Sequence, residues 1–442
     1  MARSHCFMVG LAAALWLGAA APVRADLFDY VKKPDDSFSW KLKDKLELPE
    51  GTVYNLQLVS QTWQSIRWEH DLQVFLPKGV KPGGKMLLWN QGGKASVAST
   101  AFGMLLAKKA QAPVALLFGI PNQPLLENDK KKGLTEDALI AETFVRYLNT
   151  KDEEWPLLFP MVKSLVRAMD ALQDFAMKEW GVRIEGFIVT GGSKRGWTTW
   201  LTAAADSRVQ AIAPLVIDTL NMKAQLPHQL KSYGKYSEQI KDYVERGLAP
   251  PPDTPEAQRL WGMVDPWNYR KRLTVPAMII NGANDPYWTV DSLNLYWDDL
   301  TCDKWVLYVP NAGHDLNQKL ENGAKDRDRA INALTAFTRH IVKNNPMPKL
   351  EWKHDNADGN ARLTVSSNPM PKAARVWISQ APTRDFRKMT WTAADLTLND
   401  GKYVAILPMP PMGYTALFGE LDFEIEGVRH QLSTQVRVLE AK

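Results

Sequence analysis

Between residues 85 and 341, short apolar runs alternate with segments in which apolar residues recur every three or four positions. A bounded apolar run of four to eight residues is typical of a strand inside a sheet, and the three-to-four spacing is typical of an amphipathic helix. Successive parallel strands need a crossover connection, which is usually a helix. The alternation therefore predicts an α/β fold, with a mostly parallel sheet covered by helices on both faces.

Eight strands are predicted in this sheet. The first two, Thr52–Trp63 and Ile66–Pro77, are separated by only two residues, so we expect them to form an antiparallel pair. The other predicted strands are Lys85–Trp89, Pro113–Phe118, Ile184–Thr190, Val209–Ile217, Val275–Ile280 and Lys304–Val309. The predicted helices are Val97–Lys109, Glu136–Leu148, Pro156–Trp180, Thr198–Ala205 and Arg327–Ile341.

Two regions depart from the alternation. Residues 221–272 are polar and contain three consecutive prolines, and we interpret them as an insertion that caps the C-terminal edge of the sheet. From residue 347 to residue 442, period-two strands are separated by Asn, Asp, Gly and Pro turns, a pattern that predicts a separate all-β domain of the sandwich type. The α/β domain is accordingly expected over residues 26–346.

Residues 1–25 have the pattern of a secretory signal peptide. Arg3 precedes an apolar run from Phe7 to Ala21, and the residues that follow predict cleavage after Ala25. The run is short for a helix that spans a bilayer, so we expect a periplasmic or secreted protein with no stable membrane span. Cleavage would leave Cys302 as the single cysteine of the mature chain, which excludes an intramolecular disulfide.

The composition argues against several classes of function. The net charge of +5 over 442 residues is too small and too dispersed to indicate a nucleic-acid partner. The sequence has no Cys/His cluster with metal-ligand spacing and no phosphate-binding Gly-Lys-Ser/Thr loop, so we expect neither a metal nor an organic cofactor. Nothing in the sequence indicates an oligomeric state.

The clearest chemical signal follows the predicted strand Ile184–Thr190. The run Gly191-Gly192-Ser193-Lys194-Arg195-Gly196 comes next and opens a helix. A sharp strand-to-helix turn can present a serine hydroxyl as a nucleophile, and glycines relieve the crowding around it. The second glycine comes one position later than in the usual G-x-S-x-G pattern, because Arg195 takes its place. A glycine-rich turn without catalysis is the alternative interpretation.

An acid and a histidine follow two other strands at the same edge of the sheet. Asp285 lies after the seventh predicted strand and His314 after the eighth. A serine hydroxyl becomes nucleophilic when a histidine takes its proton, and a carboxylate holds that imidazole in the required tautomer. We therefore predict a catalytic triad of Ser193, His314 and Asp285, with Asp218 as the alternative acid.

The predicted oxyanion donors are the backbone amide of Lys194, at the start of the helix, and that of Gln91 or Gly92, in the loop after the third strand. The predicted substrate-binding residues are Arg195, Trp197 and Trp288. A basic side chain at a helix N-terminus opposes the helix dipole, which is tolerated in a solvated turn but would also suit an anionic substrate group. Aromatic residues line many ligand clefts, with core packing as the alternative for both tryptophans.

The run from Gly191 to Trp200 resembles the PhoPQ-activated pathogenicity-related family, as do the segments Gly119–Pro124, Asp265–Pro276 and Asn311–Asp315. The resemblance extends over about residues 30–440. It implies an exported protein with an α/β-hydrolase fold and a β-rich C-terminal part, and a link to bacterial virulence or envelope stress. It names no substrate.

These patterns predict an exported serine hydrolase that acts on ester or amide bonds in a small-molecule, peptide or glycan substrate. The alternative is a secreted binding protein that keeps the hydrolase fold without catalysis, because a fold does not dictate a function.

Overall fold

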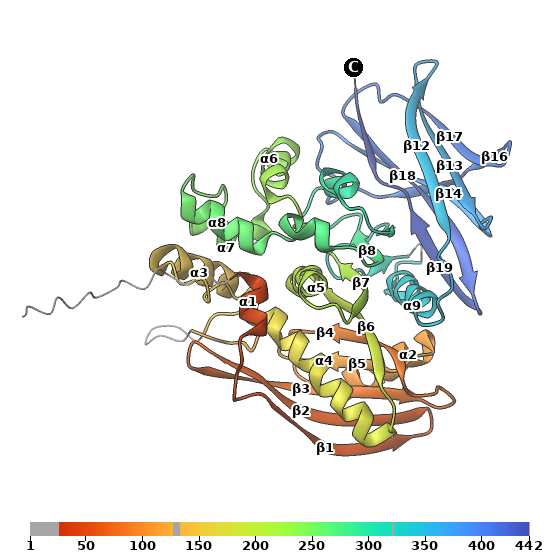
Figure 1. Ribbon diagram of the computed structural model, residues 1–442. Helices are drawn as coiled ribbons and strands as arrows, with labels where there is room; N and C mark the ends of the chain where they lie inside the picture. Colours follow the sequence, from red (N-terminus) through yellow and green to blue (C-terminus); the bar gives the residue numbers. More distant parts are fainter. Residues whose placement is uncertain (1–25, 127–132, 321, 442) are drawn as a thin grey trace, which may run out of the picture.

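The computed structural model describes residues 26–126, 133–320 and 322–441. Within them, all eight predicted strands form one sheet in the order β2-β3-β5-β4-β6-β7-β8-β9 (Figure 1). The strands are β2 (Gly51–Trp63), β3 (Ile66–Pro77), β4 (Gly84–Asn90), β5 (Val114–Leu117), β6 (Ile184–Gly192), β7 (Val209–Leu215), β8 (Ala277–Gly282) and β9 (Lys304–Val309). The strands from β5 to β9 are parallel to one another, and β2 and β3 are antiparallel. This is the α/β-hydrolase fold.

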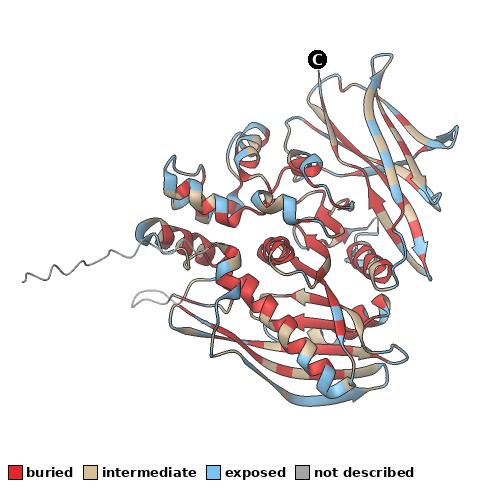
Figure 2. Cartoon of the chain, in the orientation of Figure 1, coloured by how far each residue is buried: buried red, intermediate tan, exposed pale blue. Residues whose placement is uncertain are grey.

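Helices cover both faces of the sheet, as the alternation predicts. The helices are α1 (Leu27–Lys32), α2 (Val97–Ala110), α3 (Glu136–Thr150), α4 (Leu158–Trp180), α5 (Lys194–Ala205) and α9 (Asp328–Val342). Successive residues of β4 point to opposite faces: Leu88 packs in the cluster that contains the α4 side chains, and Leu87 packs in the cluster that contains those of α2 and α9. Helices α2 and α9 therefore pack on one face of the sheet and α4 and α5 on the other, and their sides that face the sheet are buried (Figure 2).

The edge strand that precedes β2 was not predicted. Strand β1 (Ser39–Leu48) pairs antiparallel with β2 at the edge of the sheet and is largely exposed (Figure 2). Its sequence alternates Leu with Lys, Asp and Glu, which suits an edge strand because charged side chains discourage pairing with a second chain. Because this strand is only weakly hydrophobic, it does not invite pairing with a second chain. For the same reason, a search for buried apolar runs does not predict it.

The C-terminal region is all β, as predicted, and has two layers. One layer is a sheet in the order β12-β13-β17-β16. The other, β19-β18-β14-β15, continues the central sheet beyond β9 instead of standing apart, with Ser433 of β19 opposite Val306 of β9. The strands are β12 (Lys349–Ala357), β13 (Asn360–Asn368), β14 (Ala373–Ala381), β15 (Thr392–Asp395), β16 (Thr397–Asn399), β17 (Lys402–Pro408), β18 (Tyr414–Ile425), β19 (Val428–Ser433) and β20 (Arg437–Glu440), the last pairing with β18.

The insertion between β7 and β8 contains α6 (Met222–Tyr233), α7 (Lys241–Glu245) and α8 (Pro255–Val264) and lies beside α5 (Figure 1). The indole nitrogen of Trp197 in α5 donates to the carbonyl oxygen of Val264 at 2.6 Å. Asp265 accepts the backbone amide of Met222 at 2.9 Å, which ties the two ends of the insertion together. These bonds hold the insertion over the start of α5.

The predicted signal peptide, residues 1–25, lies outside the described residues. Among the helices that the structure describes, none is both long and apolar enough to cross a bilayer.

A buried ion cluster ties the C-terminal layer to α9. Glu420 of β18 is fully buried and accepts from Arg329 of α9 at 2.6 Å and from Arg375 of β14 at 2.7 Å. Breaking a buried ion pair leaves uncompensated charge, so we expect Glu420→Gln to lower the free energy of unfolding by about 3 kcal/mol. Glu238→Gln, which breaks an exposed pair with Lys235, is the matched control and should have no measurable effect. Urea titrations followed by circular dichroism measure both, and equal midpoints for the two variants would contradict this account.

Candidate active site

Ser193 occupies a strained turn between β6 and α5. Its backbone has φ +57° and ψ −125°, a conformation that costs an L-residue about 1–3 kcal/mol. The amide of Ser193 donates to the carbonyl oxygen of Leu215 in β7 at 2.9 Å, and its carbonyl oxygen accepts from Trp197 at 3.0 Å as the helix begins. The turn is therefore anchored on both sides, as a nucleophile elbow requires.

Two glycines make room for this turn. A Cβ at Gly191 would lie 2.7 Å from Cβ of Arg195, and a Cβ at Gly196 would lie 2.5 Å from Ile217. Gly191 thus leaves space for the residue two positions after the serine, and Gly196 lets α5 pack closely beside β7. This arrangement explains how an arginine can stand where the usual motif has glycine.

His314 and Asp285 form a hydrogen-bonded pair. Nδ1 of His314 lies 2.8 Å from Oδ2 of Asp285, whose Oδ1 accepts the amide of Tyr287 at 2.8 Å. The pairing leaves Nε2 of His314 as the atom available to take a proton. This nitrogen is buried, and neither Ser193 nor any other described residue hydrogen-bonds to it. The structure thus brings together the acid and the histidine, without closing the hydrogen bond to the serine.

Asp218, the alternative acid, belongs to a different cluster. It is buried and accepts from the hydroxyl of Tyr296 at 2.5 Å and from Nδ2 of Asn281 at 3.0 Å. Burial outweighs these two hydrogen bonds and, with a contribution from the charge of Asp285, raises the pKa of Asp218 to about 7. The hydrogen-bond partner of the imidazole is Asp285.

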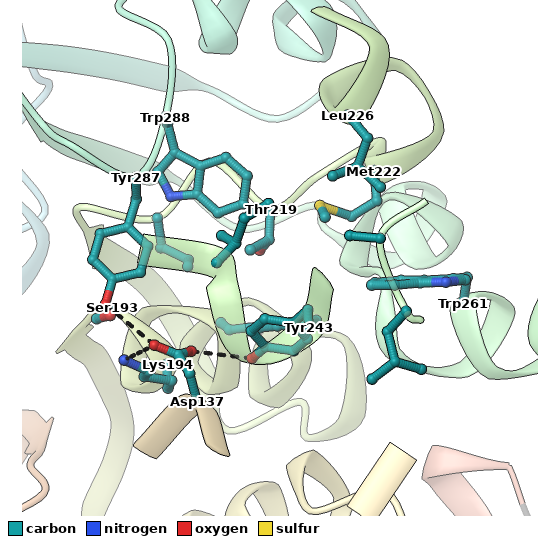
Figure 3. A pocket seen from close by; sticks show the side chains of 15 residues that line it. Asp137, Ser193, Lys194, Thr219, Met222, Leu226, Tyr243, Trp261, Tyr287 and Trp288 are labelled. Atoms are coloured by element: carbon teal, nitrogen blue, oxygen red, sulfur yellow. Dashed lines mark hydrogen bonds and ion pairs between the residues drawn. The ribbon is translucent and has the colours of Figure 1, made fainter. Parts of the chain in front are cut away.

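Tyr287 lies near both His314 and Ser193, and no role for it was predicted from the sequence. Its ring stacks on the imidazole of His314, with ring centroids 4.2 Å apart. Its hydroxyl donates to Oδ2 of Asp137 at 3.2 Å, and it lines the same cavity as Ser193 (Figure 3). Burial first, and then the charge of Asp137, raises the pKa of Tyr287 well above its usual range. The only sequence signal for Tyr287 is its position two residues after Asp285.

In the loop after β4, Gln91 is excluded as the predicted oxyanion donor. The amide of Gln91 already donates to the carbonyl oxygen of Leu117 at 2.8 Å, so it is not free to bind an oxyanion. The amides of Gly92 and Lys194 make no hydrogen bond to the residues that the structure describes. Gly92 packs against the guanidinium of Arg195 with no room for a Cβ. Gly92 and Lys194 remain the candidate donors.

The basic pair is neutralised by two acids at the start of α3. Nζ of Lys194 lies 2.7 Å from Asp137, and Arg195 donates to both carboxylate oxygens of Glu136 at 2.7 and 2.8 Å. The guanidinium of Arg195 is buried and also donates to the carbonyl oxygen of Ile120. Arg195 does not line the cavity beside Ser193, so its predicted role in attracting an anionic substrate has no support in this geometry.

The contact with Arg195 shifts the pKa of Glu136. Burial opposes its ionisation, but the hydrogen bonds and charge of Arg195, aided by Gln123 and Lys194, prevail and lower the pKa of Glu136 to about 2. Gln123 also accepts the amide of Glu136 at 2.8 Å, where the backbone has φ +52°. The Arg195–Glu136 pair is therefore a fixed support behind the elbow.

A small cavity of about 40 Å³ lies beside Ser193, between α5 and the insertion (Figure 3). Trp197 and Trp288, the two predicted substrate-binding tryptophans, both line it. The remaining lining residues are Asp137, Ser193, Lys194, Ile217, Thr219, Met222, Leu226, Ile240, Tyr243, Leu248, Ala249, Trp261 and Tyr287. The insertion supplies much of this wall, so it encloses the space next to the nucleophile.

Residues 27–387 match the model of the family described as PhoPQ-activated pathogenicity-related protein. The chain belongs to this family. It is 32% identical over 435 residues to autocrine proliferation repressor protein A of Dictyostelium discoideum, an alignment that covers 90% of this chain and 85% of that protein.

Two solved esterase structures are also similar to this family member. Acetyl xylan esterase 1 from Thermoanaerobacterium sp. has a TM-score of 0.49 at 14% identity, covering 71% of this chain and 91% of the esterase. The glucuronoyl esterase of Solibacter usitatus has a TM-score of 0.41 at 11% identity, covering 70% and 87%.

Segments that carry the family resemblance meet behind the elbow. Gly119–Pro124 provides the carbonyl oxygen of Ile120 for Arg195 and the side chain of Gln123 for Glu136. The run Gly191–Trp200 provides Arg195 itself. In this member of the PhoPQ-activated pathogenicity-related family, both segments therefore position the same turn.

The raised pKa of Asp218 predicts a pH dependence of stability. The pKa is about 7 in the folded state and about 3.9 when the chain unfolds, so the folded state binds this proton more tightly. The stabilisation is complete below pH 4 and is lost as the pH rises towards 7. Asp218→Asn should therefore gain stability relative to the wild type by up to about 4 kcal/mol between pH 4 and pH 8. Urea unfolding at both pH values tests this, and a pH-independent difference would contradict it.

Proposed function

We propose that this protein is a serine hydrolase that cleaves ester or amide bonds with Ser193 as its nucleophile. The observation that carries the proposal is the strained turn at Ser193, which follows β6 of an α/β-hydrolase sheet. The Asp285–His314 pair, placed after β8 and β9, supplies the base that such a nucleophile needs.

The chemistry proceeds by acyl transfer. Oγ of Ser193 bonds to the carbonyl carbon while its proton passes to Nε2 of His314, and the amides of Lys194 and Gly92 hold the oxyanion. Collapse of this intermediate breaks the bond to the leaving group, which takes the proton from His314. Water then repeats the sequence, releasing the acid and restoring Ser193. Catalytic hydrogen bonds commonly tighten only when substrate is bound, and we infer that the Ser193–His314 bond forms at that stage.

We also propose that the protein acts outside the cytoplasm, either in a periplasm or after secretion. The pattern of residues 1–25 supports export, and the family description supports a link to virulence. The unpaired Nε2 of His314 and the proliferation repressor among the relatives favour one second candidate, a secreted binding protein without catalysis.

Hydrolysis of 4-nitrophenyl acetate tests the proposed function. We expect Ser193→Ala and His314→Gln each to lower kcat/KM by about 1000-fold or more, because both residues act as one catalytic unit. Cys302→Ala is the control, since Cys302 is a buried free thiol outside the proposed machinery. No activity in the wild type would favour the binding protein, and full activity in folded Ser193→Ala would contradict Ser193 as the nucleophile.

The ion pair of Arg195 generates a second prediction about activity. Because Glu136 neutralises the guanidinium, Arg195→Ala should lower kcat/KM to the same extent for a neutral ester and an anionic one. 4-Nitrophenyl acetate and the hemisuccinate ester of 4-nitrophenol are suitable substrates. A loss of kcat/KM at least tenfold larger for the anionic ester would show that Arg195 binds the substrate after all.

A further inference from the structure

The cavity beside Ser193 is too small for an extended substrate. Its volume is about 40 Å³, compared with about 320 Å³ and 610 Å³ for two other clefts of the molecule. Apolar and aromatic side chains, among them Ile217 and Met222, form most of its wall. A short group attached to the carbonyl carbon would fill it.

Unpaired donors distinguish this cavity from a plain apolar pocket. The hydroxyl of Thr219 and the indole nitrogen of Trp288 are buried, with 2% and 8% of each residue exposed, and neither has a hydrogen-bond partner among the described residues (Figure 3). A buried donor without a partner is destabilising. The indole nitrogen of Trp197, in the same wall, is paired with Val264. The indole nitrogen of Trp261, which also lines the cavity, is a third unpaired donor. Several unpaired donors around one small cavity indicate a ligand atom that accepts hydrogen bonds.

The position of His314 shows which part of a substrate would enter this cavity. The leaving group must receive a proton from Nε2 of His314. His314 does not line this small cavity but a second cleft of about 320 Å³, together with Gln91 and Gly192. The leaving group therefore belongs in this second cleft, and the acyl group belongs in the cavity behind Ser193.

The insertion limits the length of that acyl group. The small cavity beside Ser193 and a groove of about 610 Å³ on the insertion share three lining residues, Met222, Leu226 and Trp261. Their side chains form the partition between the two spaces. Removing part of this partition would connect the cavity to the groove and admit a longer chain.

Resting on the proposed hydrolase function, we propose that the small cavity beside Ser193 is an acyl subsite for a short acyl group that carries an oxygen acceptor. Thr219 and Trp288 donate to that oxygen, and Met222, Leu226 and Trp261 set the maximum chain length. The substrate class is therefore an ester or amide of a short oxygen-bearing acid, such as an alkoxy- or hydroxyacyl group.

Two esters of equal size test the acceptor. 4-Nitrophenyl methoxyacetate and butyrate differ only by oxygen in place of one methylene group. We expect Thr219→Val, which removes the hydroxyl at constant shape, to lower the ratio of their kcat/KM values by about tenfold, the equivalent of one neutral hydrogen bond. The intrinsic reactivity of the two esters cancels because each variant is assayed with the same pair. Trp288→Phe should lower the ratio in the same direction, so the test survives if one variant fails to fold.

Thr338→Val is the matched control. Thr338 is buried in α9, where its hydroxyl donates to the carbonyl oxygen of Leu334 at 2.8 Å, so its replacement should leave the ratio unchanged. A ratio within twofold of the wild-type value in both Thr219→Val and Trp288→Phe would overturn the acceptor subsite.

The partition is tested with chain length. The wild type should prefer the butyrate to the octanoate ester, and Leu226→Ala should raise the octanoate-to-butyrate ratio at least tenfold. A wild type that prefers octanoate, or a Leu226→Ala variant with the wild-type ratio, would overturn the length limit. If hydrolysis depends on Ser193 but the variants have the wild-type ratios, the subsite is refuted and the proposed function stands. If none of these esters is hydrolysed, the proposed function and the subsite are refuted together.

Discussion

The backbone of Ser193 is held in a conformation that residues with a side chain rarely adopt, and the arrangement of the site depends on it. Hydrogen bonds to Leu215 and from Trp197 anchor the turn. The absence of a side chain at Gly191 leaves room for Arg195 to approach. The strain is sustained because the surrounding sheet and helix over-determine this conformation. It aims a hydroxyl at the space between the sheet and the insertion.

The charged side chains behind the Ser193 turn pair with one another, so their first role is structural and not substrate binding. Lys194 and Arg195 lie at a helix N-terminus, where the dipole disfavours them, and the acids at the start of α3 compensate. Their ion pairs fasten α3 to α5, so the first turn of α3 is tied to the turn that carries Ser193. Because Asp137 also accepts from Tyr287, which stacks on His314, one contact chain extends from the basic pair to the proposed catalytic base.

Local patterns were sufficient for most of the fold and for part of the site. Buried strands and amphipathic helices carry their own periodicity, so all eight core strands were predicted, whereas the charged edge strand β1 was missed. The continuation of the central sheet from β9 to β19 depends on pairing over more than 100 residues, which no local pattern records. The position of Asp285 and His314 after adjacent strands follows from topology. The ion pairs of Arg195 and the occupied amide of Gln91 depend on three-dimensional contacts, so sequence alone could not reveal them.

The central claim is that His314 and Asp285 make the hydroxyl of Ser193 reactive. The most direct measurement is intact-protein mass spectrometry after incubation with a fluorophosphonate, an electrophile that bonds covalently to activated serines. The account predicts one adduct on the wild type, located at Ser193, with much slower labelling in His314→Gln. A folded wild-type protein that stays unlabelled, or one labelled at the same rate without His314, would contradict it.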